Sequence, residues 1–345
     1  MATDAPAPDQ DREDVAGPGD LARPEVRAEL IDTTLGHHAT MPAEIPAKGW
    51  WQVLKRVWRE TTSDRMSMMA ASCAFYAMLA LFPAISVLIS LYGLVLDPSS
   101  VEGQLQAVRD ILPAAAYDLV AQRVHDLAAK GSTTLSWGVA IGFLFALWSA
   151  TAGTKALINA LNIAYEEEEK RSFLRLNLVA IAMTLCGIVG VSVALSVIVG
   201  VPAALRLENL GPAAGIAVRL LSFLLLIGCV VVGLSVLYRF GPDRHEARWH
   251  WITPGSILAG VLWLLASLLF SFYVGHFASY DVTYGSLGAV VIVLMWFYIS
   301  AFVVMLGAEL NAELELQTKQ DTTTGPARPM GQRGAYVADH VAVAE

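Results

Sequence analysis

The sequence predicts an all-α integral membrane protein with six transmembrane helices and both termini in the cytoplasm. Of its 345 residues, 55% are hydrophobic and 16% are charged, whereas soluble domains carry about 25% charged residues. The apolar residues gather in long runs without Asp, Glu, Lys or Arg, and a helix needs about 20 such residues to cross a bilayer. Lys and Arg near the ends of these runs are concentrated on the side that carries both termini, which predicts that this side is cytoplasmic.

Two tails flank the predicted membrane domain, which covers residues 48–317. Residues 1–47 are rich in Ala, Pro, Asp and Glu and show no apolar period, so we expect a disordered N-terminal tail. Residues 318–345 also lose all periodicity, which predicts a disordered C-terminal tail.

The membrane domain begins with a predicted amphipathic helix over residues 49–61. Large apolar residues share one face of this helix, and basic residues lie off it. The apolar face comprises Trp50, Trp51, Leu54, Val57 and Trp58. Because tryptophan favours headgroup depth, we expect the helix to lie at the membrane interface. A helix that docks on protein is the alternative.

Six spans follow this helix. We expect them at residues 70–96, 135–154, 176–205, 220–238, 251–280 and 282–308. The outer loop at residues 97–134 has helical apolar spacing, which predicts two amphipathic helices over the outer side of the bundle. The last two spans are parted by a tight outer hairpin, where Tyr280, Asp281 and Tyr284 are expected to anchor the interface, with an outer gate or binding site as the alternative.

Polar side chains at membrane depth form the candidate site. They are Lys155, Asn159, Asn162, Glu309, Asn311 and Arg65. The first three share one helical face, and the others belong to spans that reach the same cytoplasmic level. We expect an ion pair between Lys155 and Glu309, since charges inside a membrane are rare and paired. Two interpretations stay open: a cavity that binds a charged headgroup or solute, and a clamp between helices.

A ladder of small residues precedes this polar face on the second span. Gly138, Gly142, Ala146 and Ala150 recur at every fourth position, which lets another helix approach closely.

Motifs of soluble enzymes are missing from the sequence. It contains no HExxH, Walker, GxSxG or CxxC pattern, and its three cysteines lie inside apolar runs. We therefore expect no catalytic residue, metal or cofactor. The net charge is −8 and no basic surface domain is visible, so we expect no nucleic-acid partner.

Several long strings resemble one bacterial family. They are AASCAFYAMLALFP (70–83), LWSATAGTKALINALNIAYEEEEKRSFL (147–174), LYRFGPD (237–243), RWHWITPGSILAGVLWLLASLLFSFYV (248–274) and YGSLGAVVIVLMWFYISAFVVMLGAELNAELE (284–315). The chain resembles the YihY/BrkB family of bacterial inner-membrane proteins over residues 50–315. The resemblance implies six spans and a multi-pass inner-membrane location. It implies no settled activity, but members of the family are linked to serum resistance and to export of envelope lipid or lipopolysaccharide, so we expect a role in transport. Ribonuclease BN is an older label of this family, but the HxHxDH metal motif of tRNA-processing enzymes is missing here.

Together these observations predict transport of a lipid-like or amphipathic envelope component. A membrane scaffold or envelope-assembly factor is the alternative, and a ribonuclease is disfavoured. The expected partners are membrane lipids, anionic ones included, with a second copy of the chain or another envelope protein as a further partner.

Overall fold

The computed structural model describes residues 34–62, 64–95, 137–206, 212–277 and 286–342, together with residues 109, 117, 118, 121 and 122. Six long helices dominate this part of the chain. They are α3 (Asp64–Val95), α6 (Trp137–Ala164), α7 (Phe173–Arg206), α8 (Pro212–Phe240), α9 (Trp249–Phe277) and α11 (Ser286–Leu316). Within the described ranges, α7, α8, α9 and α11 contain segments long and apolar enough to cross a membrane. The predicted class of helical membrane protein is therefore confirmed.

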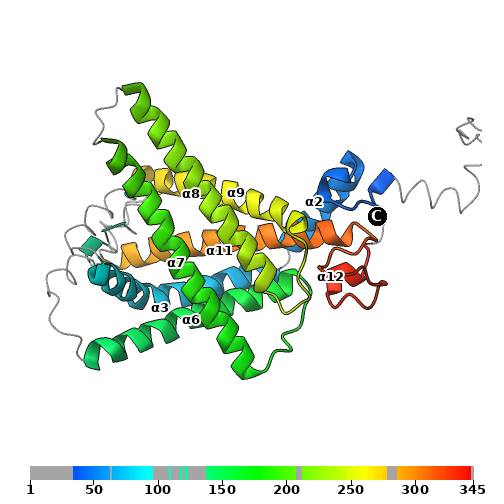
Figure 1. The fold of residues 1–345 in the computed structure, drawn as a ribbon, viewed down its shortest axis with the longest axis horizontal. Coiled ribbons are helices and arrows are strands. Elements are labelled where there is room, and N and C mark those ends of the chain that lie inside the picture. Colours follow the sequence, from blue (N-terminus) through cyan, green and yellow to red (C-terminus); the bar gives the residue numbers. More distant parts are fainter. Residues whose placement is uncertain are drawn as a thin grey trace, which may run out of the picture.

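The six helices form a closed ring in chain order. Each of them packs against the next, from α3 through α6, α7, α8 and α9 to α11, and α11 then packs against α3. α11 also contacts α6, so it is the most widely connected helix of the ring. In Figure 1, α7 and α8 cross the other helices steeply, whereas α3, α6 and α11 run close to one direction.

The small-residue ladder predicted in α6 lies on a helix that packs closely against α3. A Cβ atom added at Gly153, beyond the ladder, would lie 3.6 Å from the carbonyl oxygen of Tyr76 on α3. The surroundings of Gly138, Gly142 and Ala146 fall outside the described side chains, so their packing role stays a prediction. Residues 280–284 and most of the outer loop also lie outside the described residues.

The first and last described segments of the chain meet at one end of the ring, which we call the capped end. It comprises the end of α11 near Leu316 and the elements gathered around it (Figure 1). These elements are η2 (Pro42–Glu44), α2 (Ala47–Thr61) and α12 (Tyr336–Asp339). The structure thus corrects the predicted disorder for residues 34–46 and 318–342, whereas residues 1–33 and 343–345 lie outside the described chain.

The C-terminal segment folds around one buried arginine. The guanidinium of Arg333 donates to the carbonyl oxygens of Lys319 (2.8 Å), Gln320 (3.0 Å), Arg328 (3.1 Å) and Ala338 (2.6 Å). A bridge between Ala247 and Thr323 ties the same segment to the α8–α9 loop. These contacts are made by polar and backbone groups rather than by an apolar face, which explains why the sequence of this segment shows no apolar period.

Helix α2 occupies the region where an amphipathic helix was predicted. Its buried face contains Val53, Arg56 and Val57 and packs against α11. Trp51 is 62% exposed and Trp58 is 72% exposed, so these two rings face away from the bundle. The predicted apolar face is therefore divided between two sides of the helix: Val57 lies on the side that packs against α11, whereas Trp51 and Trp58 lie on the exposed side.

Candidate functional site

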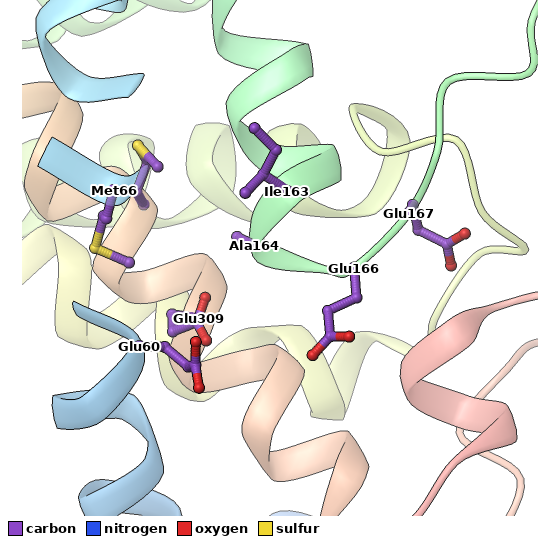
Figure 2. A pocket seen from close by; sticks show the side chains of 8 residues that line it. Glu60, Met66, Ile163, Ala164, Glu166, Glu167 and Glu309 are labelled. Atoms are coloured by element: carbon purple, nitrogen blue, oxygen red, sulfur yellow. The ribbon is translucent and has the colours of Figure 1, made fainter. Parts of the chain in front are cut away.

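A cavity of about 490 Å³ opens at the capped end. The end of α2, the start of α3, the end of α6 and the last turns of α11 supply its walls, as Figure 2 shows. Four carboxylates and four apolar side chains line it. The lining residues are Glu60, Met66, Ile163, Ala164, Glu166, Glu167, Met305 and Glu309.

Glu309 is the buried acidic residue of this cavity. Glu309 is only 7% exposed, and its side chain lines the cavity beside Glu60 (Figure 2). Among the described residues it has no hydrogen-bond or ion-pair partner. The charged groups that act on it are the carboxylates of Glu313, Glu60 and Glu166. Burying a charge without a partner is costly, so this position is prepared for a proton or a cation.

The next acidic residue on the same face of α11 is neutralised by α2. Glu313 lies four residues after Glu309, and it forms a buried ion pair with Arg56. Arg56 also donates to the side chain of Gln317 at 2.8 Å, and Gln317 donates to the carbonyl oxygen of Leu35 at 2.8 Å. Arg56 is therefore bound to the end of α11 rather than to the cavity.

The predicted ion pair between Lys155 and Glu309 is not formed. Lys155 instead donates to Asn177 on α7, with 3.1 Å between Nζ and Oδ1. Asn177 in turn donates to the carbonyl oxygen of Phe173 at 2.7 Å. The two charges were matched by depth alone, and depth does not fix which way a side chain points around its helix axis. Lys155 turns toward α7, whereas Glu309 faces the end of α2.

The predicted asparagines have separate roles. Asn162 donates to Glu169 at 2.9 Å and accepts from the backbone N–H of Asp243 at 2.8 Å, so it joins the α6–α7 and α8–α9 loops. Asn311 is fully buried and accepts from the backbone N–H of Gly255 on α9 at 2.8 Å. Asn159 is exposed, and the side chain of Arg65 lies outside the described side chains.

The loop after α6 contributes carboxylates to both the cavity and its surroundings. Arg171 donates to both oxygens of Glu169, at 2.7 and 2.6 Å, which holds the pKa of that carboxyl below its ordinary value. Burial instead raises the pKa of Glu167, although the backbone N–H of Tyr336 donates to it at 2.7 Å. Glu166 and Glu167 belong to the acidic run Glu166–Glu169, and the sequence did not predict them as lining residues of the cavity.

A sequence signal for these missed residues exists in retrospect. Glu60 precedes the first span, Glu166 follows the second, and Glu309 ends the last. All three positions lie at the end of the bundle that the distribution of Lys and Arg predicts to be cytoplasmic. Acidic residues at three matching levels could have indicated an acidic cavity, but only the closed ring shows that they meet.

Comparison with known proteins places the chain in a family. Residues 57–331 match the model of the family described as "Virulence factor BrkB". The chain belongs to the BrkB family. This confirms the resemblance seen in the sequence, and every residue that lines the cavity lies within the matched range.

Proteins similar to this chain are described as membrane proteins or as ribonuclease-like. The chain is 32% identical to "Putative ribonuclease-like protein YfkH" of Bacillus subtilis, over 77% of this chain and 96% of that protein. It is 27% identical to a UPF0761 membrane protein of Tolumonas auensis, over 74% of this chain and 83% of the relative. A UPF0761 membrane protein of Pseudoalteromonas translucida is 26% identical, over 79% and 88% of the two chains. No solved structure matches the chain.

Proposed function

We propose that this protein moves a lipid-like or otherwise amphipathic envelope component across or within the bacterial inner membrane. The observation that carries the proposal is the cavity at the capped end, which combines a buried carboxylate without a partner and an apolar wall of Met66, Ile163 and Met305. Its volume of about 490 Å³ suits a small molecule or a lipid headgroup. A purely structural role would leave the burial of Glu309 without a compensating contact.

The proposal includes a topology of six spans with both termini in the cytoplasm. α3 has 32 residues and α6 has 28, so both are long enough to join the four spans identified by hydropathy. The capped end carries the arginine-rich loops, which supports a cytoplasmic position for it. Trp51 and Trp58 are exposed there, as expected for side chains at headgroup depth.

A scaffold remains the second candidate function, because specific contacts favour it. Asn162, Asn311 and the Lys155–Asn177 hydrogen bond all join helices or loops of the ring. These contacts account for three of the six polar residues that suggested a binding site. Glu309 is the buried member of the described set that they leave unexplained.

Ribonuclease activity, suggested by the name of the Bacillus relative, gains no support from the cavity. Four carboxylates line it, and they would repel the polyanionic backbone of RNA, which has no cationic group to offset them. A ribonuclease would have to show RNA cleavage by purified protein that survives strict removal of contaminating nucleases.

Lipid flux in proteoliposomes separates transport from a scaffold. We expect the Glu309→Gln variant to reconstitute normally yet to lose flux at least about tenfold, because its carboxylate contacts the cargo. Lys155→Met is the control: loss of its hydrogen bond to Asn177 should lower stability while flux per folded molecule stays close to wild type. Unchanged flux in Glu309→Gln, or a wild type that moves no lipid, would favour the scaffold.

A further inference from the structure

We propose that the cavity binds a primary ammonium group, with Glu309 as its counter-ion. The inference rests on the proposed transport function and names the chemical class of its cargo. It replaces the expectation of an anionic lipid with that of an amine-bearing one.

The cavity is acidic. Glu60, Glu166, Glu167 and Glu309 line it, and none of the described lining residues is basic. The nearby cation Arg56 is held by Glu313 and Gln317. Arg59 lies 3.5 Å from Glu60, but its side chain is more than half exposed and so it is strongly screened by water. The resulting field attracts cationic groups and disfavours ligands of net negative charge.

The burial of Glu309 is an observation independent of the charge of the cavity. Clusters of acidic residues are common on protein surfaces, where water solvates them. Glu309 differs because it is 7% exposed, faces the cavity and has no partner among the described side chains. A buried carboxylate of this kind is stabilised when a cation donates hydrogen bonds to it.

The size and walls of the cavity favour an organic cation. About 490 Å³ is far more than the roughly 30 Å³ that one water molecule occupies. In the described part of the chain, no three His, Cys, Asp or Glu side chains converge closely enough to hold a metal ion. Met66 and Met305 instead supply flexible apolar contacts that suit the methylene groups next to an amine.

The lining also distinguishes a primary from a quaternary ammonium. A primary ammonium has N–H groups that can donate to the buried carboxylate of Glu309, whereas a quaternary ammonium has none. Quaternary ammonium groups are recognised by aromatic cages, and the described lining residues include no aromatic ring. An ethanolamine headgroup therefore fits this site better than a choline headgroup.

The test measures ligand binding by the full-length protein in detergent. Native mass spectrometry and thermal shift would compare phosphatidylethanolamine, phosphatidylcholine and phosphatidylglycerol, with spermidine as a soluble amine. We expect the ethanolamine lipid to bind at least about tenfold more tightly than the other two lipids. Tight binding of spermidine that the ethanolamine lipid does not displace would assign the same ammonium site to a soluble amine.

Matched variants tie this binding to the cavity. Glu309→Gln keeps the shape of the side chain and removes its charge, and it should abolish the preference for amines. Glu60→Gln should weaken it, and this substitution is well tolerated because the Glu60 side chain is 45% exposed. Glu168→Gln removes an exposed charge from the same acidic run without touching the cavity, so it should bind as wild type does.

Other results overturn the inference. Equal retention of all three lipids, or an amine preference that survives in both Glu309→Gln and Glu60→Gln, would show that the cavity does not select ammonium groups. Uptake of a proton by Glu309 with no amine binding would also show that the cavity does not select ammonium groups. Amine binding without lipid flux would instead refute only transport, whereas flux of lipids without amine selectivity would refute only the ammonium site.

Discussion

Gly255 on α9 and Gly307 on α11 bring the backbones of their helices into contact. A Cβ atom added at Gly307 would lie 2.6 Å from the carbonyl oxygen of Gly255 and 2.6 Å from the hydroxyl of Tyr238. Asn311, one turn further along α11, accepts the N–H of Gly255 and holds the two helices at this distance. The last turns of α11 that shape the cavity are positioned by this approach.

Substitution of Gly307 by Ala should therefore destabilise the ring. The added methyl group has no space, because two of its nearest atoms belong to a backbone carbonyl and to a buried tyrosine. We expect a loss of about 1–3 kcal/mol in the free energy of unfolding, or failure to accumulate. The measurement is the yield and thermal midpoint of monodisperse protein in detergent.

Gly228→Ala on α8 is the matched control. A Cβ atom at Gly228 meets no atom within 4 Å, and alanine favours the helix by about 1 kcal/mol. Its yield and midpoint should equal or exceed those of the wild type. Equal behaviour of the two alanine variants would show that α9 and α11 are further apart.

Two buried tyrosines should respond in opposite ways to removal of their hydroxyl groups. Tyr238 donates to the carbonyl oxygen of Val304 at 2.7 Å, so Tyr238→Phe should cost about 1 kcal/mol. The hydroxyl of Tyr165 is buried without a hydrogen-bond partner in the described chain, so Tyr165→Phe should be neutral or stabilising. Its ring contact with Arg244 is kept. Chemical denaturation in mild detergent would measure both changes; a larger loss in Tyr165→Phe would contradict the assignment.

Arg244 and Glu315 form a buried ion pair that should show strong coupling. Their two hydrogen bonds measure 3.0 and 2.7 Å, and both side chains are almost fully buried. Arg244→Met alone should cost about 3–5 kcal/mol, because Glu315 would stay buried without its cation. Arg244→Met combined with Glu315→Leu should lose less than the sum of the two single changes. A double-mutant cycle measures this coupling, and additive losses would argue against the pair.

Stability of the α6–α7 loop should fall at acidic pH. The pKa of Glu169 is lowered below its ordinary value of 4.5, chiefly by the hydrogen bonds from Arg171. A carboxyl with a lowered pKa stabilises the fold above its unfolded pKa and loses that contribution as pH falls through its folded pKa. The backbone N–H of Arg171 donates to Glu169 at 3.1 Å. We therefore expect the hydrogen-exchange protection factor of this amide to fall only below about pH 4.5.

The Glu169→Gln variant provides the control for this pH effect. Glutamine does not titrate, so exchange at Arg171, corrected for the intrinsic rate, should be less protected at neutral pH and independent of pH between 3 and 6. A wild-type protein with the same flat profile would show that Glu169 does not stabilise the loop.

Much of the fold could be predicted because hydropathy and periodicity are local properties of the chain. The predicted span at residues 251–280 corresponds to α9, and the span at residues 220–238 lies inside α8. Long strings of specific residues also indicated the family, which the comparison confirms.

The candidate site was only partly predictable. Glu309 was chosen because it lies at membrane depth, and the structure places it in the cavity. Its assigned partner, Lys155, was wrong, because rotation about a helix axis depends on contacts with neighbouring helices. Arg333 shows the same limit for the C-terminal segment, since its acceptors are backbone carbonyls brought together only by the folded chain.

The sequence by itself determined the membrane class, the positions of the apolar helices and the family, because each follows from residues close together along the chain. The tertiary structure alone decided which charges meet. It paired Arg56 with Glu313 and Arg244 with Glu315, and it left Glu309 facing a cavity. The physical reason is that electrostatic energy depends on distance and burial in space, and neither is fixed until the ring has closed.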